Sequence, residues 1–157
     1  MAATRKLIRM TDDERAAFLE QPHKMQLATI NPDGTPHLVT MYYAMFEGLI
    51  GFWTYRTSQK AVNLERDPRM TCLMETGEGY EQLRGAQING TVERIEDPDR
   101  IRSIGAAVYA RYIADFTAEL EGYLEPQARK RWAYLVHPDK ISSWDHRKLA
   151  PAMTAGA

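Results

Sequence analysis

The strongest constraint on the fold is a pair of hairpin signals in the first third of the chain. Residues 24–30 alternate polar and apolar side chains, as a half-buried strand does. The run Asn31–Pro36 contains prolines, an aspartate and a glycine, a composition typical of a tight turn. Residues 37–46 then return as a second strand, and after the turn at Glu47–Gly48 residues 49–55 form a third. Two consecutive hairpins predict an antiparallel meander.

The remaining chain adds strands and a few helices. Residues 83–95 predict a long strand, and Gly85 and Gly90 within it indicate bends or bulges of a curled sheet. A capping-box sequence that starts at Thr11 predicts a first helix, which ends at Pro22. The predicted fold class is mainly β with peripheral helices, arranged as a small antiparallel barrel of about six strands. Further strands are expected at 69–75, 132–136 and 141–144, and further helices at 58–66, 97–112 and 117–124.

Length and charge exclude several classes of protein. Of the 157 residues, 1–150 are expected to form one domain that buries its own core, and 151–157 a flexible C-terminal tail. The formal net charge of -1 argues against a dedicated nucleic-acid-binding protein. No window approaches the ~20 apolar residues of a membrane span, and the histidines show no metal-ligand spacing. The single Cys72 lies in an apolar run, where a buried, inert thiol is expected, and a cytoplasmic location fits this.

Residues 54–64 carry the strongest functional signal. They run from a strand end into a helix start, where Thr57 or Ser58 can cap the helix and leave free backbone N–H groups in the first turn. Arg56 and Lys60 lie at this end, which is unfavourable for cations because the helix dipole is positive there. Lys60 also lacks an acidic residue three or four positions further on. The segment therefore predicts a phosphate site, and the alternative is a capped surface helix with solvated cations.

A second group of reactive side chains lies near the C-terminus. Asp145 and His146 are adjacent, but neighbouring residues of an extended segment point to opposite faces, so an Asp–His pair is not expected. Trp144 has two interpretations, which are packing in a core or interface and a flat lid against an aromatic cofactor. The glycines at 77 and 79 are interpreted as part of a hairpin loop, since the third glycine of a dinucleotide-binding motif is absent.

Aromatic side chains surround the predicted phosphate site at Tyr42, Tyr43, Trp53 and Tyr55. Because side chains alternate along strands, half of these are expected to face the interior and half the outside. Outward aromatic side chains on a small barrel need cover, which predicts a dimer interface, although core packing explains some of them equally well.

Several local sequences follow one another in a fixed order between Thr11 and Leu149. They are Leu27-Ala-Thr29, Asn31-Pro-Asp-Gly-Thr-Pro-His37, Thr54, Ser58, Lys60, Asn63-Leu64, Asp67-Pro-Arg69, Gly90, Pro138 and Trp144. In this order and spacing, they resemble the pyridoxamine 5'-phosphate oxidase-like split-barrel family. The similarity is closest to the branch of that family that uses the deazaflavin coenzyme F420.

This resemblance implies a six-stranded Greek-key split β-barrel of the FMN-binding type, usually a homodimer with the cofactor in a groove between subunits. The implied cofactor is F420, with FMN as the alternative. In the family the phosphate is held at the strand–helix corner, the ring borders the backbone before the second hairpin turn, and a tryptophan reaches the cofactor from the partner subunit. Together with Arg56 and Thr57, which local chemistry adds, the cofactor-binding residues expected are Thr40, Met41, Tyr42, Thr54, Arg56, Thr57, Ser58, Gln59, Lys60 and Trp144.

The predicted function is hydride transfer between F420 and an unsaturated organic acceptor of the quinone, enone or tetrapyrrole type. No catalytic residue is assigned, and Tyr42, Tyr55 and His146 are candidates only if they line the ring. Pyridoxamine phosphate oxidation is not expected, because Gly85 stands where the oxidases carry a flavin-contacting glutamine and their substrate-binding run after the tryptophan is incomplete here.

Two alternatives stay open, an FMN-dependent oxidoreductase of the same fold and a flavin- or tetrapyrrole-binding protein without turnover. Extra cations at the groove mouth, such as Arg147 and Lys148, would favour the polyglutamate-bearing tail of F420, although solvated side chains are the simpler interpretation of these two.

Overall fold

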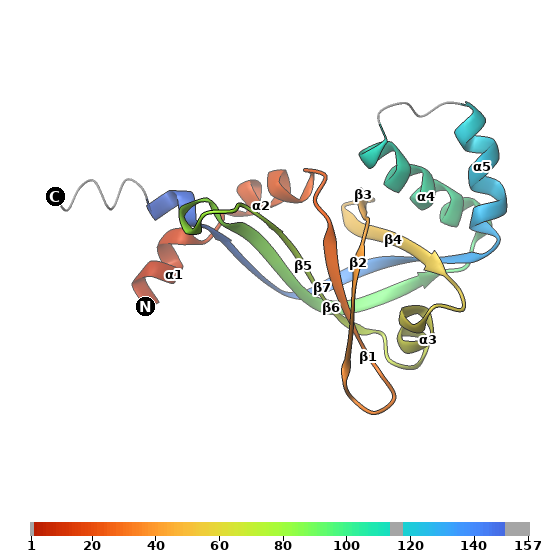
Figure 1. Ribbon diagram of the computed structural model, residues 1–157, viewed down its shortest axis with the longest axis horizontal. Coiled ribbons are helices and arrows are strands. Elements are labelled where there is room, and N and C mark those ends of the chain that lie inside the picture. The colour runs from red at the N-terminus through yellow and green to blue at the C-terminus, as the bar shows by residue number, and fades with distance from the viewer. Residues whose placement is uncertain (1, 114–117, 150–157) are drawn as a thin grey trace.

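A curled antiparallel sheet forms the body of the molecule (Figure 1). The computed structural model describes residues 2–113 and 118–149. Within these residues, seven strands form one sheet in the order β2-β1-β5-β6-β7-β4-β3. The strands are β1 (Met25–Ile30), β2 (Pro36–Met41), β3 (Ala44–Phe46), β4 (Leu49–Tyr55), β5 (Arg69–Thr76), β6 (Arg84–Ile95) and β7 (Arg131–Asp145).

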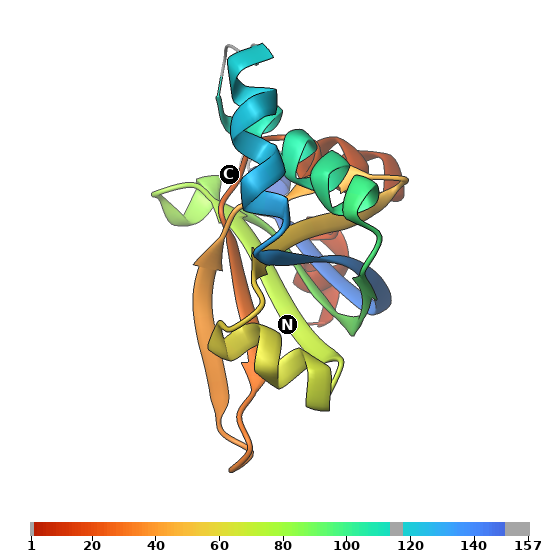
Figure 2. The same ribbon diagram turned by 90° about the vertical axis from the view of Figure 1, so that its right-hand side faces the viewer.

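Helices lie at both ends of this sheet (Figures 1 and 2). At one end α4 and α5 pack together, and at the other α1 lies beside the short 3-10 helix η2. The sequence predicted α2, α3 and α4, whereas α1 was not predicted. The helix expected at 117–124 is present as α5, and Thr117 lies outside the described residues. The helices are α1 (Ala2–Ile8), α2 (Asp12–Leu19), α3 (Gln59–Arg66), α4 (Pro98–Tyr112), α5 (Ala118–Ala128), η1 (Tyr80–Gln82) and η2 (His146–Leu149).

The two edge strands of the sheet are consecutive in the chain. Only Tyr42 and Tyr43 separate β2 from β3, yet these strands occupy opposite edges, so the sheet curls into a split barrel. The prediction of one continuous strand over 37–46 was therefore wrong. Tyr43 is fully buried and its hydroxyl donates to the Leu19 carbonyl (3.0 Å), whereas Tyr42 is exposed. The chain turns at this tyrosine pair from one edge of the sheet to the other.

The last strand was also predicted differently. Residues 132–136 and 141–144 were expected as two short strands, but β7 runs without interruption through Pro138. A register shift in the β6–β7 pairing lies between Asn89 and Gly90, opposite Pro138. A bulge tolerates a proline, which cannot donate to a ladder. A Cβ at Gly90 would lie 2.2 Å from the His137 carbonyl oxygen, so the bulge requires glycine. The predicted curled antiparallel barrel is confirmed, with seven strands in place of six.

Two hydrophobic clusters hold the fold. One fills the inside of the curled sheet and includes Phe52 and Cys72, and the other joins the sheet to α4 and α5 through Trp53 and Ile104. Cys72 is fully buried, as expected, and burial raises the pKa of its thiol to about 12. The predicted tail at 151–157 lies outside the described residues. Among the helices described, none has the length and apolar character needed to cross a membrane.

Candidate functional site

The corner between β4 and α3 brings hydrogen-bond donors together. Ser58 is the N-cap of α3, and its hydroxyl accepts a hydrogen bond from the Ala61 N–H (3.4 Å). The hydroxyl oxygens of Thr54 and Ser58 lie 3.2 Å apart. The N–H groups of Gln59 and Lys60 belong to the first turn of α3, where a helix offers no internal acceptor. The predicted cap at this corner is therefore confirmed, and it is made by Ser58.

Lys60 supplies the positive charge at the corner. Its side chain is half-buried, and no acid within the described part of the chain forms an ion pair with it. Burial lowers the pKa of Lys60 below its ordinary value, because the ammonium group loses hydration without gaining an opposite charge. A bound anion would supply that charge and stabilise the protonated form.

Asn63 fixes α3 against β1. Its side chain is fully buried, and its amide nitrogen donates to the Thr29 hydroxyl (3.1 Å) and to the Asn31 side-chain oxygen (3.0 Å). The Gln59 amide donates in turn to the Asn63 side-chain oxygen (2.9 Å). The Gln59 side chain is thus held along the helix, and its backbone N–H is the group available to a ligand at the corner. This network holds the first turn of α3 rigidly in place.

Arg56, the second predicted cation, is placed differently from Lys60. Its guanidinium lies 3.8 Å from the centre of the Trp132 ring, and its Nε donates to the Arg131 carbonyl (3.1 Å). Thr57 is exposed between Arg56 and the cap of α3. Arg56 therefore borders the corner from the side of β7, while Lys60 lies within the helix turn.

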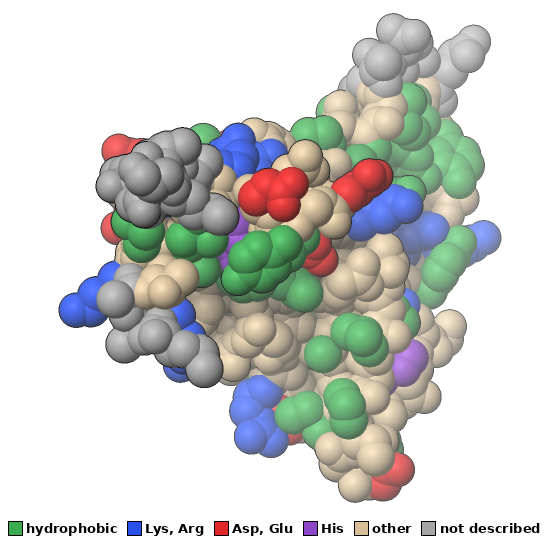
Figure 3. All heavy atoms as spheres, turned by 60° about the vertical axis from the view of Figure 1, so that its left-hand side comes forward, with side chains coloured by type: hydrophobic (Ala, Val, Ile, Leu, Met, Phe, Trp, Pro, Cys, Tyr) green, Lys and Arg blue, Asp and Glu red, His purple; other side chains and the backbone are tan. Residues whose placement is uncertain are grey.

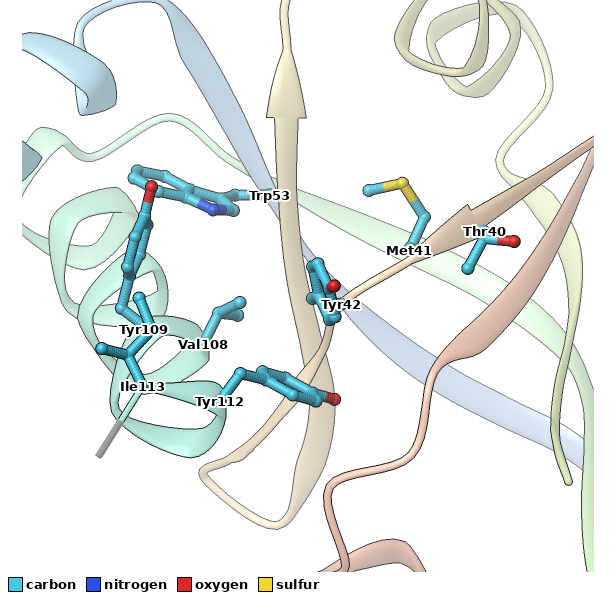
Figure 4. A pocket seen from close by; sticks show the side chains of 8 residues that line it. All are labelled: Thr40, Met41, Tyr42, Trp53, Val108, Tyr109, Tyr112 and Ile113. Atoms are coloured by element: carbon cyan, nitrogen blue, oxygen red, sulfur yellow. The ribbon is translucent and has the colours of Figure 1, made fainter. Parts of the chain in front are cut away.

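A pocket of about 410 Å³ opens beside the end of β2 (Figure 4). Trp53 and Thr54 are neighbours in β4, so their side chains point to opposite faces, one toward this pocket and one toward the corner. The pocket joins three predicted site residues to a wall that was not predicted. Its lining residues are Thr40, Met41, Tyr42, Trp53, Val108, Tyr109, Tyr112 and Ile113.

The new wall is the C-terminal part of α4. Gly105 allows α4 to approach β4 closely, because a Cβ at that position would lie 2.5 Å from Cζ3 of Trp53. The Tyr109 ring meets Trp53 edge-on at 6.1 Å, and the Tyr112 ring lies 4.6 Å from Tyr42. The sequence showed that α4 is amphipathic, but which strand it covers depends on packing between distant residues.

Hydrogen bonds anchor this end of α4 to the turn after α2. The Tyr112 hydroxyl donates to the His23 carbonyl (2.6 Å) and accepts from the Tyr43 N–H (3.5 Å). The Arg111 guanidinium donates to the carbonyl oxygens of Leu19 and Gln21. These hydrogen bonds hold the pocket wall from outside the pocket. The Tyr112 hydroxyl therefore already has hydrogen-bond partners in the protein.

Trp144 lies far from both the corner and the pocket within one chain. It is near the C-terminal end of β7, which Figure 1 places at the end of the sheet opposite α4. Its ring covers Gly85 of β6, where a Cβ would lie 2.3 Å from the Trp144 Cζ2 atom. A single chain therefore does not bring Trp144 to the other predicted site residues.

The C-terminal acid and histidine do not pair with each other. Asp145 is buried and accepts hydrogen bonds from the Arg147 guanidinium at 2.6 and 2.9 Å, which hold the pKa of this carboxyl below its usual value. The His146 ring nitrogen Nδ1 lies 2.8 Å from the Tyr80 carbonyl oxygen. The expectation that these neighbours form no catalytic pair is confirmed.

The C-terminal cations named for the cofactor tail have acidic partners. Arg147 is bound to Asp145, and Lys148 is bound to Glu14 and donates to the Arg9 carbonyl (2.8 Å). Figure 3 brings this end forward and shows acidic and basic side chains interspersed on the surface. Both cations are thus neutralised within the chain, and they give no support to an anionic tail.

Other candidate residues lie at the edge of the site. Tyr42 and Tyr55 are 52% and 49% exposed, while Tyr43 and Trp53 are buried, so the predicted division of the aromatic residues is confirmed. Arg131 lies 3.9 Å from the centre of the Tyr55 ring. Over the residues that the structure describes, no cluster of three potential metal ligands occurs.

The fold and the site together define a split-barrel protein with a donor-rich corner and an adjoining aromatic pocket. A family model described as pyridoxamine 5'-phosphate oxidase matches residues 11–145. The match spans most of the chain, and the protein belongs to this family.

Relatives and solved structures agree with that assignment. A pyridoxine/pyridoxamine 5'-phosphate oxidase of Rubrobacter xylanophilus is 26% identical over 92% of this chain and 75% of its own length. The structure of a conserved hypothetical protein from Mycobacterium tuberculosis is 40% identical, with a TM-score of 0.86 over 91% of this chain and 89% of that chain. An F420 reductase structure is 26% identical, with a TM-score of 0.64 over 80% of this chain and 94% of that chain.

Proposed function

We propose that the protein is an oxidoreductase that transfers a hydride between coenzyme F420 and an unsaturated organic acceptor. The observation that carries the proposal is Lys60, a half-buried cation without an acidic partner among the described residues, beside the capped start of α3. Hydroxyl groups, free N–H groups and a cation in one place fit the phosphate of a flavin-type cofactor. When bound in its reduced form, the deazaflavin supplies a hydride to the acceptor, and solvent supplies the proton.

The chain contributes binding and orientation to this reaction. The Thr54 and Ser58 hydroxyls, the Gln59 N–H and the Lys60 ammonium hold the phosphate, and Arg56 and Thr57 border it. The backbone at Thr40, Met41 and Tyr42 lies against the ring. Thr40, Met41 and Tyr42 also line the pocket, so a ring held against their backbone would border the pocket.

A homodimer completes the site in this proposal. Trp144 lies near the C-terminal end of β7, which is at the end of the sheet opposite α4, so in this proposal it reaches the cofactor from a partner subunit. Exposed Leu38, Tyr42 and Tyr55 supply apolar area for such an interface. We also propose a cytoplasmic location.

F420 is preferred to FMN because of the similarity to an F420 reductase at 26% identity. The corner itself fits the phosphate of either cofactor. Pyridoxamine phosphate oxidation is disfavoured by the structure of the Gly85 position, since the Trp144 ring occupies the space into which a longer side chain would extend.

Cofactor titration tests the proposal. The purified protein is titrated with F420 and with FMN, and binding is followed by cofactor fluorescence. The reduced cofactor is then offered quinone, enone and tetrapyrrole acceptors. We expect binding of F420 and its oxidation by at least one acceptor. Preferential binding of FMN would support the FMN-dependent alternative, tight binding with no oxidation would support a binding protein, and binding of neither cofactor would refute the proposal.

A further inference from the structure

The aromatic pocket differs from the corner in that the lining residues that the structure describes carry no formal charge. The eight described lining residues comprise four aromatic and two aliphatic residues, the hydroxyl-bearing Thr40 and the thioether Met41. Burial raises the pKa of Tyr109 and of Tyr112, so both phenols stay protonated near neutral pH. A ligand that carries a charge would lose hydration in this pocket without gaining an ion pair, and this is costly.

Two arginines lie near the described lining without being part of it. The Arg111 guanidinium is 5.9 Å from the centre of the Tyr112 ring and donates to the Leu19 and Gln21 carbonyls. The Arg131 guanidinium lies 4.7 Å from the centre of the Trp53 ring and donates to the Gln127 carbonyl (3.1 Å). Its charge is thus shared with aromatic faces and a carbonyl. The pocket is therefore suited to an uncharged molecule.

The buried Trp53 indole can orient such a molecule from inside the pocket, whereas the exposed Tyr42 lies at its rim. The Trp53 indole N–H has no hydrogen-bond acceptor within the described residues, and Figure 4 shows the indole nitrogen on the ring edge that faces Val108. The hydroxyls of Tyr112 and Thr40 are engaged elsewhere, with His23 and Gln26. The indole N–H is a donor only, so it matches an oxygen that accepts.

The aromatic lining of the pocket favours a conjugated ligand that can pack against its rings. Aromatic side chains from β4, from α4 and from the residue after β2 surround it (Figure 4). Its volume of about 410 Å³ falls in the lower part of the range of roughly 300–1,000 Å³ that ligand pockets span. A small fused ring fits this size better than a tetrapyrrole with its ionised carboxylates.

We infer that this pocket binds the acceptor and selects an uncharged planar molecule whose carbonyl oxygen accepts a hydrogen bond from the Trp53 indole. The inference rests on the proposed function, because it takes Thr40, Met41 and Tyr42 as the border between cofactor ring and acceptor. It narrows the acceptor to neutral conjugated carbonyl compounds. It also assigns Trp53 as the residue that determines specificity for the acceptor. Gly105 allows this side chain to pack against α4.

Calorimetric titration with two probes of one ring system tests this inference without turnover. Menadione is the neutral probe, and a sulfonate of the same naphthoquinone ring is the charged one. Each is titrated into the protein alone and into the protein saturated with oxidised F420. We expect menadione to bind, and the sulfonate to bind at least ~10-fold more weakly.

Variants then locate the bound probe. Trp53→Phe retains the aromatic face but removes the N–H, and should weaken menadione binding by about 3- to 10-fold. Gly105→Ala forces Trp53 toward the pocket and should weaken it by ~10-fold or more. Gly122→Ala is the matched control, because a Cβ there meets nothing within 4 Å. Ile113→Trp fills the pocket from an exposed position, and serves if Gly105→Ala does not fold.

The outcomes separate the inference from the proposed function. Equal binding of the two probes, unchanged menadione binding in Trp53→Phe, or unchanged menadione binding in both Gly105→Ala and Ile113→Trp overturns the inference. Loss of F420 affinity in these pocket variants would place the cofactor ring in the pocket, which also overturns it and leaves the proposed function standing. The protein could also bind the two probes as expected but fail to bind F420. That result would support the selectivity of the pocket and refute the proposed function.

Discussion

Lys60 and Lys148 carry the same charge at opposite ends of the sheet, in opposite electrostatic settings. Lys148 is bound to Glu14 and to the Arg9 carbonyl, and the neighbouring Arg147 is bound to Asp145. Lys60 is half-buried, no acid in the described ranges pairs with it, and burial lowers its pKa. Arg147 and Lys148 thus have acidic partners, and Lys60 has none among the described residues. An anionic ligand gains most at Lys60, because there it replaces lost hydration instead of competing with a carboxylate.

Removal of the two lysines tests this difference and has the largest expected effect. Lys60→Ala should weaken F420 binding by about 1.5–3 kcal/mol, or roughly 10- to 150-fold, because a charge-assisted hydrogen bond to the phosphate is lost. Lys148→Ala should leave the dissociation constant unchanged. Fluorescence titration measures both. Equal losses in the two variants would mean that the corner has no special role as an anion site.

The ion pair between Arg147 and Asp145 should make the free energy of unfolding depend on pH in the acid range. Arg147 holds the pKa of Asp145 below its usual value, so the ionised carboxylate stabilises the folded state. This stability is fully present above the unfolded pKa of about 3.9 and is lost as pH falls through the lower folded pKa. Asp145→Asn should destabilise the protein by about 1–2 kcal/mol at neutral pH.

Urea unfolding at a series of pH values measures that effect. The difference between wild type and Asp145→Asn should shrink as the pH falls through the acid range. Asp139→Asn, an exposed carboxylate on the same strand, serves as the control and should follow the wild type. A constant difference at every pH would show that the ion pair does not account for the stability of this end.

The smallest expected effect is an alkaline loss of cofactor affinity. Burial lowers the pKa of Lys60 in the free protein, and a bound phosphate raises it, so binding takes up protons once the pH exceeds the lowered value. Affinity should therefore fall as the pH rises through that pKa. Lys60→Arg remains charged over this range and should give a flatter profile. Parallel profiles for the two proteins would place the titrating group elsewhere.

The corner could be predicted from the sequence because its interactions are local. Thr54, Ser58 and Lys60 lie within seven residues, and the rules for helix caps and dipoles apply to the start of any helix. The alternation of strands and the glycines of the long strand likewise predicted a curled antiparallel sheet. The bulge at Gly90 could also be predicted from a local pattern, whereas the continuation of β7 through Pro138 could not.

The aromatic pocket depends on contacts that no local pattern contains. Trp53 meets Gly105 only because α4 returns to β4, and Tyr112 reaches His23 across the molecule. Lys148 and Glu14 are joined over a still longer separation in the chain. A sequence shows that such residues exist, but the docking of whole elements decides which of them meet. For the same reason, the break at Tyr42 and Tyr43 could not be predicted.

The position of β7 in the sheet has a consequence for biosynthesis. This strand lies between β6 and β4, and it pairs with both. Until residues 131–145 have left the ribosome, the hairpin of β3 and β4 has no hydrogen-bonded connection to the sheet of β2, β1, β5 and β6. A nascent chain that stalls before Arg131 would thus expose two open strand edges at once, which are surfaces that chaperones and aggregation partners recognise. Folding of the described sheet is completed by β7.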